Sequence, residues 1–194
     1  VAPLLCAGIT TYSPLKYAGV GKGHKVAVLG LGGLGHMGVK FAVSMGAEVT
    51  MLSTSPSKEN DAKMLGAHHF ALSTDKDQMK ALRGQFDFIL NTVAAKYDLN
   101  KFLDLLTVEG KMLLVGIPPE DNELGSAKLI SRRRSIIGSN VGGIAETQEM
   151  LDYCAEHNIL SDVEMIQMKD INEAYTRISN SDVKYRFVID MASM

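Results

Sequence analysis

The sequence predicts an α/β fold, a doubly wound parallel six-stranded sheet with helices on both faces. From residue 25 onward, short apolar runs alternate regularly with amphipathic segments, which is the pattern of strand–helix–strand units. The runs VAVL, FIL and MLLV are almost continuously apolar, as expected of strands that are buried on both faces. A glycine-rich turn follows the first run directly and leads into a helical segment, which is where doubly wound folds place their first crossover.

The elements follow in order along the chain. Six strands are expected at Lys25–Leu29, Glu48–Leu52, His69–Ala71, Phe86–Leu90, Lys111–Val115 and Ser135–Gly138. The helices between them are expected at Leu34–Met45, Ser57–Leu65, Lys76–Leu82, Tyr97–Leu105 and Ser126–Arg132. A longer helix, Ile144–His157, carries Glu146 and Glu149 near its start, where the helix dipole favours acids. A strand at Val163–Met168, a helix at Ile171–Ile178 and a strand at Arg186–Asp190 complete the chain.

Composition excludes several classes of protein. The 194 residues carry a net charge of −2, with 46% hydrophobic and 22% charged residues, so neither a nucleic-acid nor a membrane partner is indicated. We interpret the basic cluster Arg132–Arg134 as a solvated helix end. No apolar run is long enough to span a bilayer. Only Cys6 and Cys154 are present and no secretory signal is visible, which predicts a cytoplasmic protein without disulfides.

The turn after the first strand has the pattern G-x-G-x-x-G, formed by Gly30, Gly32 and Gly35 with an additional Gly33. The first glycine permits the tight turn, the second lets a pyrophosphate approach the backbone, and the third lets the helix pack close to the sheet. The helix N-terminus then offers free N–H groups and a positive dipole end to phosphates. The motif predicts a Rossmann dinucleotide site; the alternative is a glycine-rich turn without a ligand.

The end of the second strand predicts which dinucleotide is bound. An NAD site usually has an acid there, whereas this chain has Ser53, Thr54 and Ser55, followed by Lys58. Hydroxyl groups and an ammonium would bind the 2′-phosphate of NADP by charge-assisted hydrogen bonds, and a carboxylate would repel it. We therefore predict NADP. Ser55 and Pro56 can also simply begin the next helix, and the two roles are compatible.

Several segments together resemble the zinc-dependent medium-chain alcohol dehydrogenases. They are CAGITTYSPLKYAGVGKGHKVAVLGLGGLGHMGVKFA, STSPSKENDAKMLGA, NTVAA, RRRSIIGSNVGGIAETQEMLDYCAEHNI and DVKYRFVID. The resemblance is strongest to the cinnamyl-alcohol dehydrogenase branch with its bacterial NADP-dependent aldehyde reductases, and it covers essentially the whole chain. It implies hydride transfer between the cofactor and a zinc-bound carbonyl carbon of a small aldehyde or alcohol.

The resemblance also implies roles for individual residues. Cys6 matches the last zinc-ligating cysteine of the family, and Thr10 the threonine that packs against the nicotinamide; both are candidate catalytic residues. Taken without the family, Cys6 would more often be a buried thiol. Arg186 resembles the arginine that reaches the pyrophosphate. The candidate cofactor-binding residues are Thr10, Gly30, Gly32, Gly33, Leu34, Gly35, Ser53, Thr54, Ser55, Lys58, Thr92, Val93, Val115, Gly116, Ser139, Asn140 and Arg186.

The chain departs from the family in its metal ligands. The other zinc ligands of the family lie upstream of the segment that contains Cys6, and the sequence opens on Val1 as if it were cut from a longer polypeptide. We expect residues 1–20 to be the end of a catalytic domain with its connecting helix, 21–155 to be the NADP-binding domain, and 156–194 to return to a catalytic domain mostly absent from this chain. The five histidines have no ligand spacing to Cys6, and we interpret each as a surface or packing residue. Cys154 is expected to pack in the core.

Zinc is therefore expected in a full-length enzyme and not in this chain alone, which we expect to be inactive by itself. Two alternatives remain: a stand-alone NADP-binding module without catalysis, and a zinc-free relative of the quinone reductases, against which Cys6 argues. The resemblance also implies a homodimer through the edge of the sixth strand, at Ser135–Val141 with Gly142 and Gly143. The apolar character of that segment suits an edge that needs covering, although an edge shielded within one chain is the other possibility.

Overall fold

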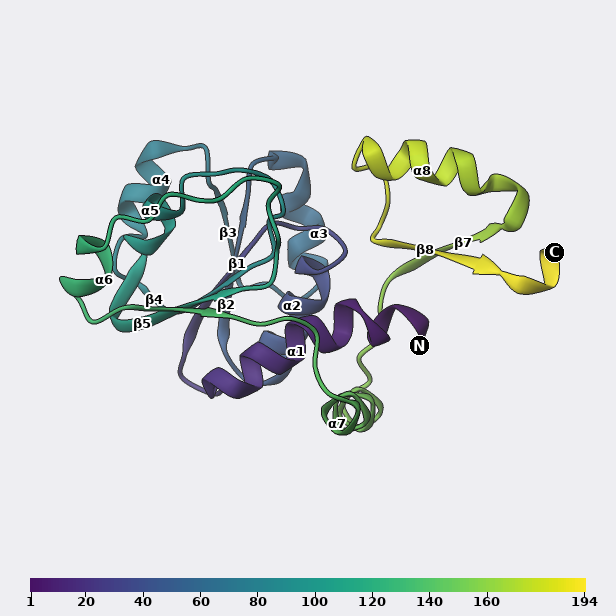
Figure 1. Cartoon of the computed structure of the whole chain (residues 1–194), viewed down its shortest axis with the longest axis horizontal. Helices are drawn as coiled ribbons and strands as arrows, with labels where there is room; N and C mark the ends of the chain where they lie inside the picture. Colours follow the sequence, from purple (N-terminus) through teal and green to yellow (C-terminus); the bar gives the residue numbers. More distant parts are fainter.

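The computed structural model describes the whole chain, residues 1–194, and its main feature is a six-stranded parallel sheet (Figure 1). The strand order is β3-β2-β1-β4-β5-β6, with every neighbouring pair parallel. The strands span β1 Lys25–Leu29, β2 Glu48–Ser53, β3 His69–Leu72, β4 Phe86–Asn91, β5 Leu106–Leu114 and β6 Ser135–Gly138. This order confirms the predicted doubly wound fold, in which β1 and β4 lie where the winding direction reverses and ligands bind.

The helices cover both faces of the sheet because successive strand side chains point to opposite sides. The helices are α1 Ala7–Ala18, α2 Gly35–Ser44, α3 Glu59–Met64, α4 Lys76–Ala81, α5 Leu99–Leu103, α6 Ala127–Ile130, α7 Ile144–Glu156 and α8 Ile171–Ser179. Val26 and Val28 of β1 belong to the larger core cluster, which also contains side chains of α1, α2, α3 and α7. Ala27 and Leu29 belong to the smaller cluster on the other face, with α5. None of the helices is both long and apolar enough to cross a bilayer.

The C-terminal part forms a second, smaller body beside the sheet (Figure 1). Strands β7 (Val163–Gln167) and β8 (Arg186–Asp190) pair in parallel, and α8 connects them. Several of its large apolar side chains are exposed, among them Met165 at 61% and Met191 at 62%. Strands β7 and β8 form a sheet of their own, while the return to a catalytic domain and the domain boundaries at residues 20 and 155 stay predictions.

The strands β1, β6 and β8 have the predicted bounds, and other elements differ for local reasons. The helix expected over Tyr97–Leu105 contains only Leu99–Leu103, since the Asp98 side chain accepts a hydrogen bond from the backbone N–H of Asn100 and so caps the helix there. Strand β5 begins at Leu106, five residues before the expected start, because an irregular register lets Leu106 pair with Phe86 ahead of the regular ladder.

The interpretation of Arg132–Arg134 as a solvated helix end is wrong for its last residue. Arg132 and Arg133 are exposed, but the side chain of Arg134 is only 3% exposed. Its guanidinium donates hydrogen bonds to the backbone carbonyls of Leu106 (Nη2, 2.6 Å) and Lys128 (Nη1, 3.3 Å). Arg134 therefore ties the start of β5 to α6, and burial lowers its pKa from the usual arginine value.

Candidate dinucleotide site

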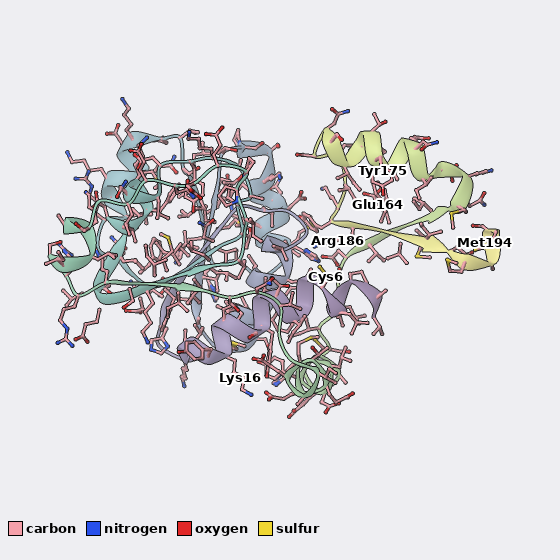
Figure 2. All side chains as sticks on the ribbon, viewed as in Figure 1. Cys6, Lys16, Glu164, Tyr175, Arg186 and Met194 are labelled. Carbon is pink, nitrogen blue, oxygen red and sulfur yellow. The ribbon has the colours of Figure 1, made fainter.

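A cavity of about 660 Å³ lies at the carboxyl ends of β1 and β4, between the glycine-rich loop and the return segment. Its walls are formed by Gly30, Leu31, Gly32, Gly33, Leu34, Lys58, Thr92, Val93, Ile178, Ser181, Val183, Tyr185, Arg186 and Phe187. Figure 2 shows Arg186 and Cys6 in the region between the large sheet and the β7–β8 pair. Two of the lining side chains are cationic and none is acidic, so the cavity is suited to a ligand with several negative charges.

The glycines of the loop have different structural reasons. Gly30 has φ +91°, in the left-handed region that a glycine adopts without steric cost. A Cβ added at Gly35 would lie 1.8 Å from the carbonyl oxygen of Gly30, so only glycine lets α2 start against the turn. A Cβ at the exposed Gly32 would meet nothing within 4 Å. The open space at Gly32 leaves its backbone accessible to a ligand.

Helix α2 begins directly after this loop, and no side chain caps its N-terminus at Leu34. The His36 N–H donates to the carbonyl oxygen of Gly32 at 3.0 Å. The Gly35 N–H, the first of the helix, stays available to an anion, and the helix dipole favours one there. The hydroxyl of Thr92 holds the end of β4 to the loop, donating to the carbonyls of Leu29 (2.9 Å) and Gly30 (3.1 Å). These hydrogen bonds hold the end of β4, with Thr92 and the neighbouring Val93, in the cavity wall.

Arg186 reaches the loop from β8. Its Nε would lie 2.4 Å from a Cβ at Gly33, so the guanidinium packs directly on that glycine. The same Nε is buried and has no hydrogen-bond partner within the chain. Buried donors are almost always satisfied in folded proteins. An anion above Gly33 would satisfy this one, and the role of Arg186 at a pyrophosphate stays a prediction.

The turn after β2 brings a cation into the cavity. The ammonium of Lys58 donates to the carbonyl oxygen of Leu31 at 2.7 Å, which ties the turn to the glycine loop. Ser53 is buried and its hydroxyl accepts from the N–H of Ser55 at 3.2 Å. Thr54 is exposed and Ser55 half-buried, with its hydroxyl 2.8 Å from that of Ser57. The structure thus places Lys58 in the cavity wall, whereas Ser53, Thr54 and Ser55 are not among the lining residues, and their cofactor role stays a prediction.

The residues expected around a nicotinamide come from other strand ends. Gly116 follows β5, and a Cβ there would lie 2.3 Å from the carbonyl oxygen of Val93, so the ends of β4 and β5 abut closely. Ser139 donates its backbone N–H to Leu114 (3.0 Å) at the end of β6. Val115, Gly116, Ser139 and Asn140, together with Thr10, lie outside the walls of the 660 Å³ cavity. Their cofactor role stays a prediction.

Cys6 is the residue before α1, and its carbonyl accepts the N–H of Thr10 at 3.0 Å. The two candidate catalytic residues are therefore one helical turn apart. The thiol of Cys6 is exposed, unlike the buried thiol that its surroundings in the sequence would favour. No group of three His, Cys, Asp or Glu side chains converges anywhere in the chain to hold a metal ion. Cys154 is buried between α7 and the core, as expected.

Sequence reasoning missed the contribution of His36 and Tyr185. His36 is fully buried in the first turn of α2, and its ring stacks on that of Tyr185, with centroids 4.8 Å apart. Its ring nitrogens lie 3.3 Å from the carbonyl oxygen of Gly32 and 3.1 Å from the hydroxyl of Ser161. This contact connects the glycine loop to the strand that carries Arg186. The only local signal was the position of His36 directly after the last glycine of the motif.

The buried His36 predicts a loss of stability in acid. Burial lowers the pKa of His36 from 6.5 to about 4, so the unfolded chain takes up a proton at a higher pH than the folded chain. Above pH 6.5 this difference leaves the free energy of unfolding unchanged. As the pH falls toward 4, the free energy of unfolding decreases by up to about 3 kcal/mol. Urea unfolding of wild type and His36→Gln between pH 7 and 4 checks this. The variant should lose less stability over that range, and equal losses would contradict the assignment.

A family model described as zinc-binding dehydrogenase matches residues 33–156 of the chain. An aldehyde reductase of Escherichia coli is 56% identical over 191 residues, which are 98% of this chain and 55% of that protein. An NADP-dependent alcohol dehydrogenase C of Mycobacterium bovis is 52% identical over 193 residues, 100% of this chain and 56% of its own length. The chain thus spans about half the length of these relatives.

Solved structures show the same similarity. A cinnamyl alcohol dehydrogenase from Sorghum bicolor has a TM-score of 0.96 and 45% identity, over 98% of this chain and 55% of that one. A CAD from Helicobacter pylori, complexed with NADP(H), has a TM-score of 0.90 and 47% identity, over 99% of this chain and 55% of its own.

Proposed function

The chain belongs to the zinc-binding dehydrogenase family, and on that premise we propose that it is the NADP-binding part of an alcohol dehydrogenase. The whole enzyme would interconvert primary alcohols and aldehydes by hydride transfer. The observation that carries the proposal is the cavity at the carboxyl ends of β1 and β4, whose walls include Lys58 and Arg186 and no acid. The names of the relatives, an NADP-dependent alcohol dehydrogenase and an aldehyde reductase, support the same conclusion.

The residues present fit a dinucleotide phosphate. The pyrophosphate would lie over Gly32 and Gly33, near the N-terminus of α2, where the unpaired Nε of Arg186 gains a partner. The adenosine would extend toward the end of β2, where Ser53, Thr54, Ser55 and Lys58 would receive it. No carboxylate there would compete with a 2′-phosphate, and a lysine ammonium would bind it by a charge-assisted hydrogen bond. These features favour NADP over NAD.

When bound, the nicotinamide supplies the hydride that is transferred to or from the substrate carbon. The residues of this chain bind and orient the cofactor. The glycine loop, Lys58 and Arg186 would hold its phosphates. Thr10 and the strand ends that carry Val115, Gly116, Ser139 and Asn140 would flank the nicotinamide ring. The closely abutting ends of β4 and β5 would help to hold the nicotinamide ring in place. Holding a reactant in position lowers the entropic part of the activation barrier for hydride transfer.

The residues of this chain do not by themselves fit a zinc ion. Cys6 is an exposed thiol that belongs to no group of three metal-ligating side chains, whereas a catalytic zinc needs three protein ligands. We propose Cys6 as one ligand of a site that the rest of a longer protein would complete. The chain alone is accordingly expected to bind NADPH without reducing aldehydes.

Titration of the chain with NADPH and NADH, followed by nicotinamide fluorescence, tests the proposal. NADPH should bind more tightly, and Lys58→Gln should weaken NADPH about tenfold with a much smaller effect on NADH. The matched control is Lys63→Gln, because Lys63 is paired with Glu59 at 2.7 Å on α3 and is not part of the cavity wall. Equal losses for both cofactors would contradict a 2′-phosphate role for Lys58. Failure of both cofactors to bind would overturn the function itself.

We also propose a homodimer through the edge formed by β6. This strand is one of the two outer strands of the sheet, and exposed apolar residues follow it, with Val141 at 41% and Ile144 at 92% exposed. Unpaired strand edges of this kind readily pair with another chain. Sedimentation equilibrium should give twice the 21.0 kDa mass of one chain, and a monomer at every concentration would refute the dimer.

A further inference from the structure

A second cavity, of about 380 Å³, lies at the amino ends of β4, β5 and β6, whereas the dinucleotide site lies at the carboxyl ends of the strands. It is lined only by polar residues, which are Arg83, Asp104, Lys128, Ser131, Arg132 and Arg134. These residues come from the end of α4, the end of α5, and α6 with the turn that precedes β6. Figure 1 shows α6 far from α8 and the return segment. Four cationic side chains therefore face one carboxylate, in a place that the proposed cofactor does not reach.

The hydrogen bonds within this basic pocket leave two guanidinium groups without a partner. The carboxylate of Asp104 is occupied by the ammonium of Lys128, which lies 2.8 and 2.7 Å from its two oxygens. The buried Arg134 directs its donors to backbone carbonyls. Arg83 and Arg132 line the same pocket and are both exposed. Neither makes a side-chain hydrogen bond or an ion pair in the structure, which leaves their donors available to a ligand.

The backbone brings these two arginines together. Gly84 has φ +66°, a conformation that favours glycine. Nη1 of Arg132 lies 2.9 Å from the position of a Cβ at Gly84, so its guanidinium rests on the residue that follows Arg83. The positive charge of Arg132 also contributes, after burial, to the lowered pKa of Arg134. The fold thus holds four cationic side chains close together, and Asp104 is the only carboxylate in the lining that offsets their repulsion.

We propose that this basic pocket binds a small multivalent oxyanion of the phosphate class. Guanidinium groups match phosphate oxygens through parallel N–H donors and stay charged at every physiological pH. The pocket has no apolar wall, so the recognised part of the ligand is the oxyanion itself. Free inorganic phosphate and a phosphomonoester present this same group. The proposal does not depend on the cofactor, because the two cavities share no residue.

Site-resolved NMR titration tests the proposal on this 21.0 kDa chain. Sodium phosphate and glycerol 3-phosphate are added at an ionic strength held constant with sodium chloride, and the backbone amides of Gly84, Ser131 and Gly32 are followed. Phosphate should shift Gly84 and Ser131 in a saturable manner, separately from any effect at Gly32 in the dinucleotide site. The tighter of the two additives identifies the source of the oxyanion.

The paired variant, in which Arg83→Gln and Arg132→Gln are combined in one chain, should lower the affinity of this site for phosphate by at least about tenfold. Both free guanidinium groups are removed in it. Arg133→Gln is the matched control: Arg133 is the neighbour of Arg132 in the chain, but it pairs with Glu109 at 3.3 Å and does not line the pocket. The proposal is overturned if phosphate shifts only Gly32, if chloride alone has the same effect, or if the Arg133 variant loses as much affinity as the paired variant.

Discussion

Gly35→Ala is expected to destabilise the fold by about 3 kcal/mol and to abolish detectable NADPH binding. The added methyl group would lie 1.8 Å from the carbonyl oxygen of Gly30, and backbone atoms cannot move aside as the end of a flexible side chain can. The start of α2 would have to shift away from the sheet, at a cost near the upper end of that seen when a packed core is overfilled. Urea unfolding and NADPH titration of the same preparation measure both effects.

Gly32→Ala is the control for this prediction, because a Cβ at Gly32 would meet no protein atom within 4 Å and its φ is not in the left-handed region. Its stability should stay within about 0.5 kcal/mol of wild type. Its NADPH affinity should still fall about tenfold or more, a loss of at least about 1.4 kcal/mol, because the methyl group occupies the space proposed for the pyrophosphate. Wild-type affinity in this variant would place the pyrophosphate elsewhere.

Arg186→Gln is expected to lower the affinity for NADPH and for NADH alike, by about tenfold to a hundredfold. A hydrogen bond between charged groups contributes about 1.5–3 kcal/mol, and the pyrophosphate is common to both cofactors. The stability of the cofactor-free chain should not fall, because the buried Nε of Arg186 has no partner to lose. Isothermal titration calorimetry with each cofactor, together with thermal unfolding without cofactor, separates the two effects.

Arg177→Gln, a substitution in the same C-terminal segment, serves as the control for Arg186→Gln and should have the opposite effects on stability and affinity. The Arg177 guanidinium donates to the carboxylates of Glu164 (2.7 Å) and Asp182 (3.0 Å) and lies over the ring of Phe187. Its replacement should lower stability and leave the affinity for NADPH largely unchanged. If Arg186→Gln behaved like Arg177→Gln, Arg186 would be a structural residue and its assignment to the pyrophosphate would be wrong.

The parts of the site that sequence reasoning could predict are those defined by neighbours in the chain. A glycine at each of positions 30, 32 and 35, after one apolar run and before one helix, predicts the turn, because the geometry of the turn is set within these few residues. The same holds for the absence of an acid after β2 and for the bounds of β1 and β6.

The parts that it could not predict depend on residues far apart in the chain. Arg134 looked like one of three equivalent surface arginines, and its burial follows from the carbonyl of Leu106 on a neighbouring strand. The start of β5 at Leu106 depends on pairing with Phe86. His36 could be assigned a role only when Tyr185 was seen stacked on it.

The sequence by itself determined the doubly wound fold and the glycine-rich turn, and it is the basis for proposing NADP over NAD, because hydrophobic period, glycine spacing and local charge all act over short stretches of chain. Only the tertiary structure decided that Arg186 lies on Gly33 with an unpaired donor, and that Arg83 and Arg132 share a pocket. These pairs come into contact only after the strands have paired and the helices have packed. The free energy that stabilises each contact comes from packing of the whole core, and no single segment of the sequence specifies it.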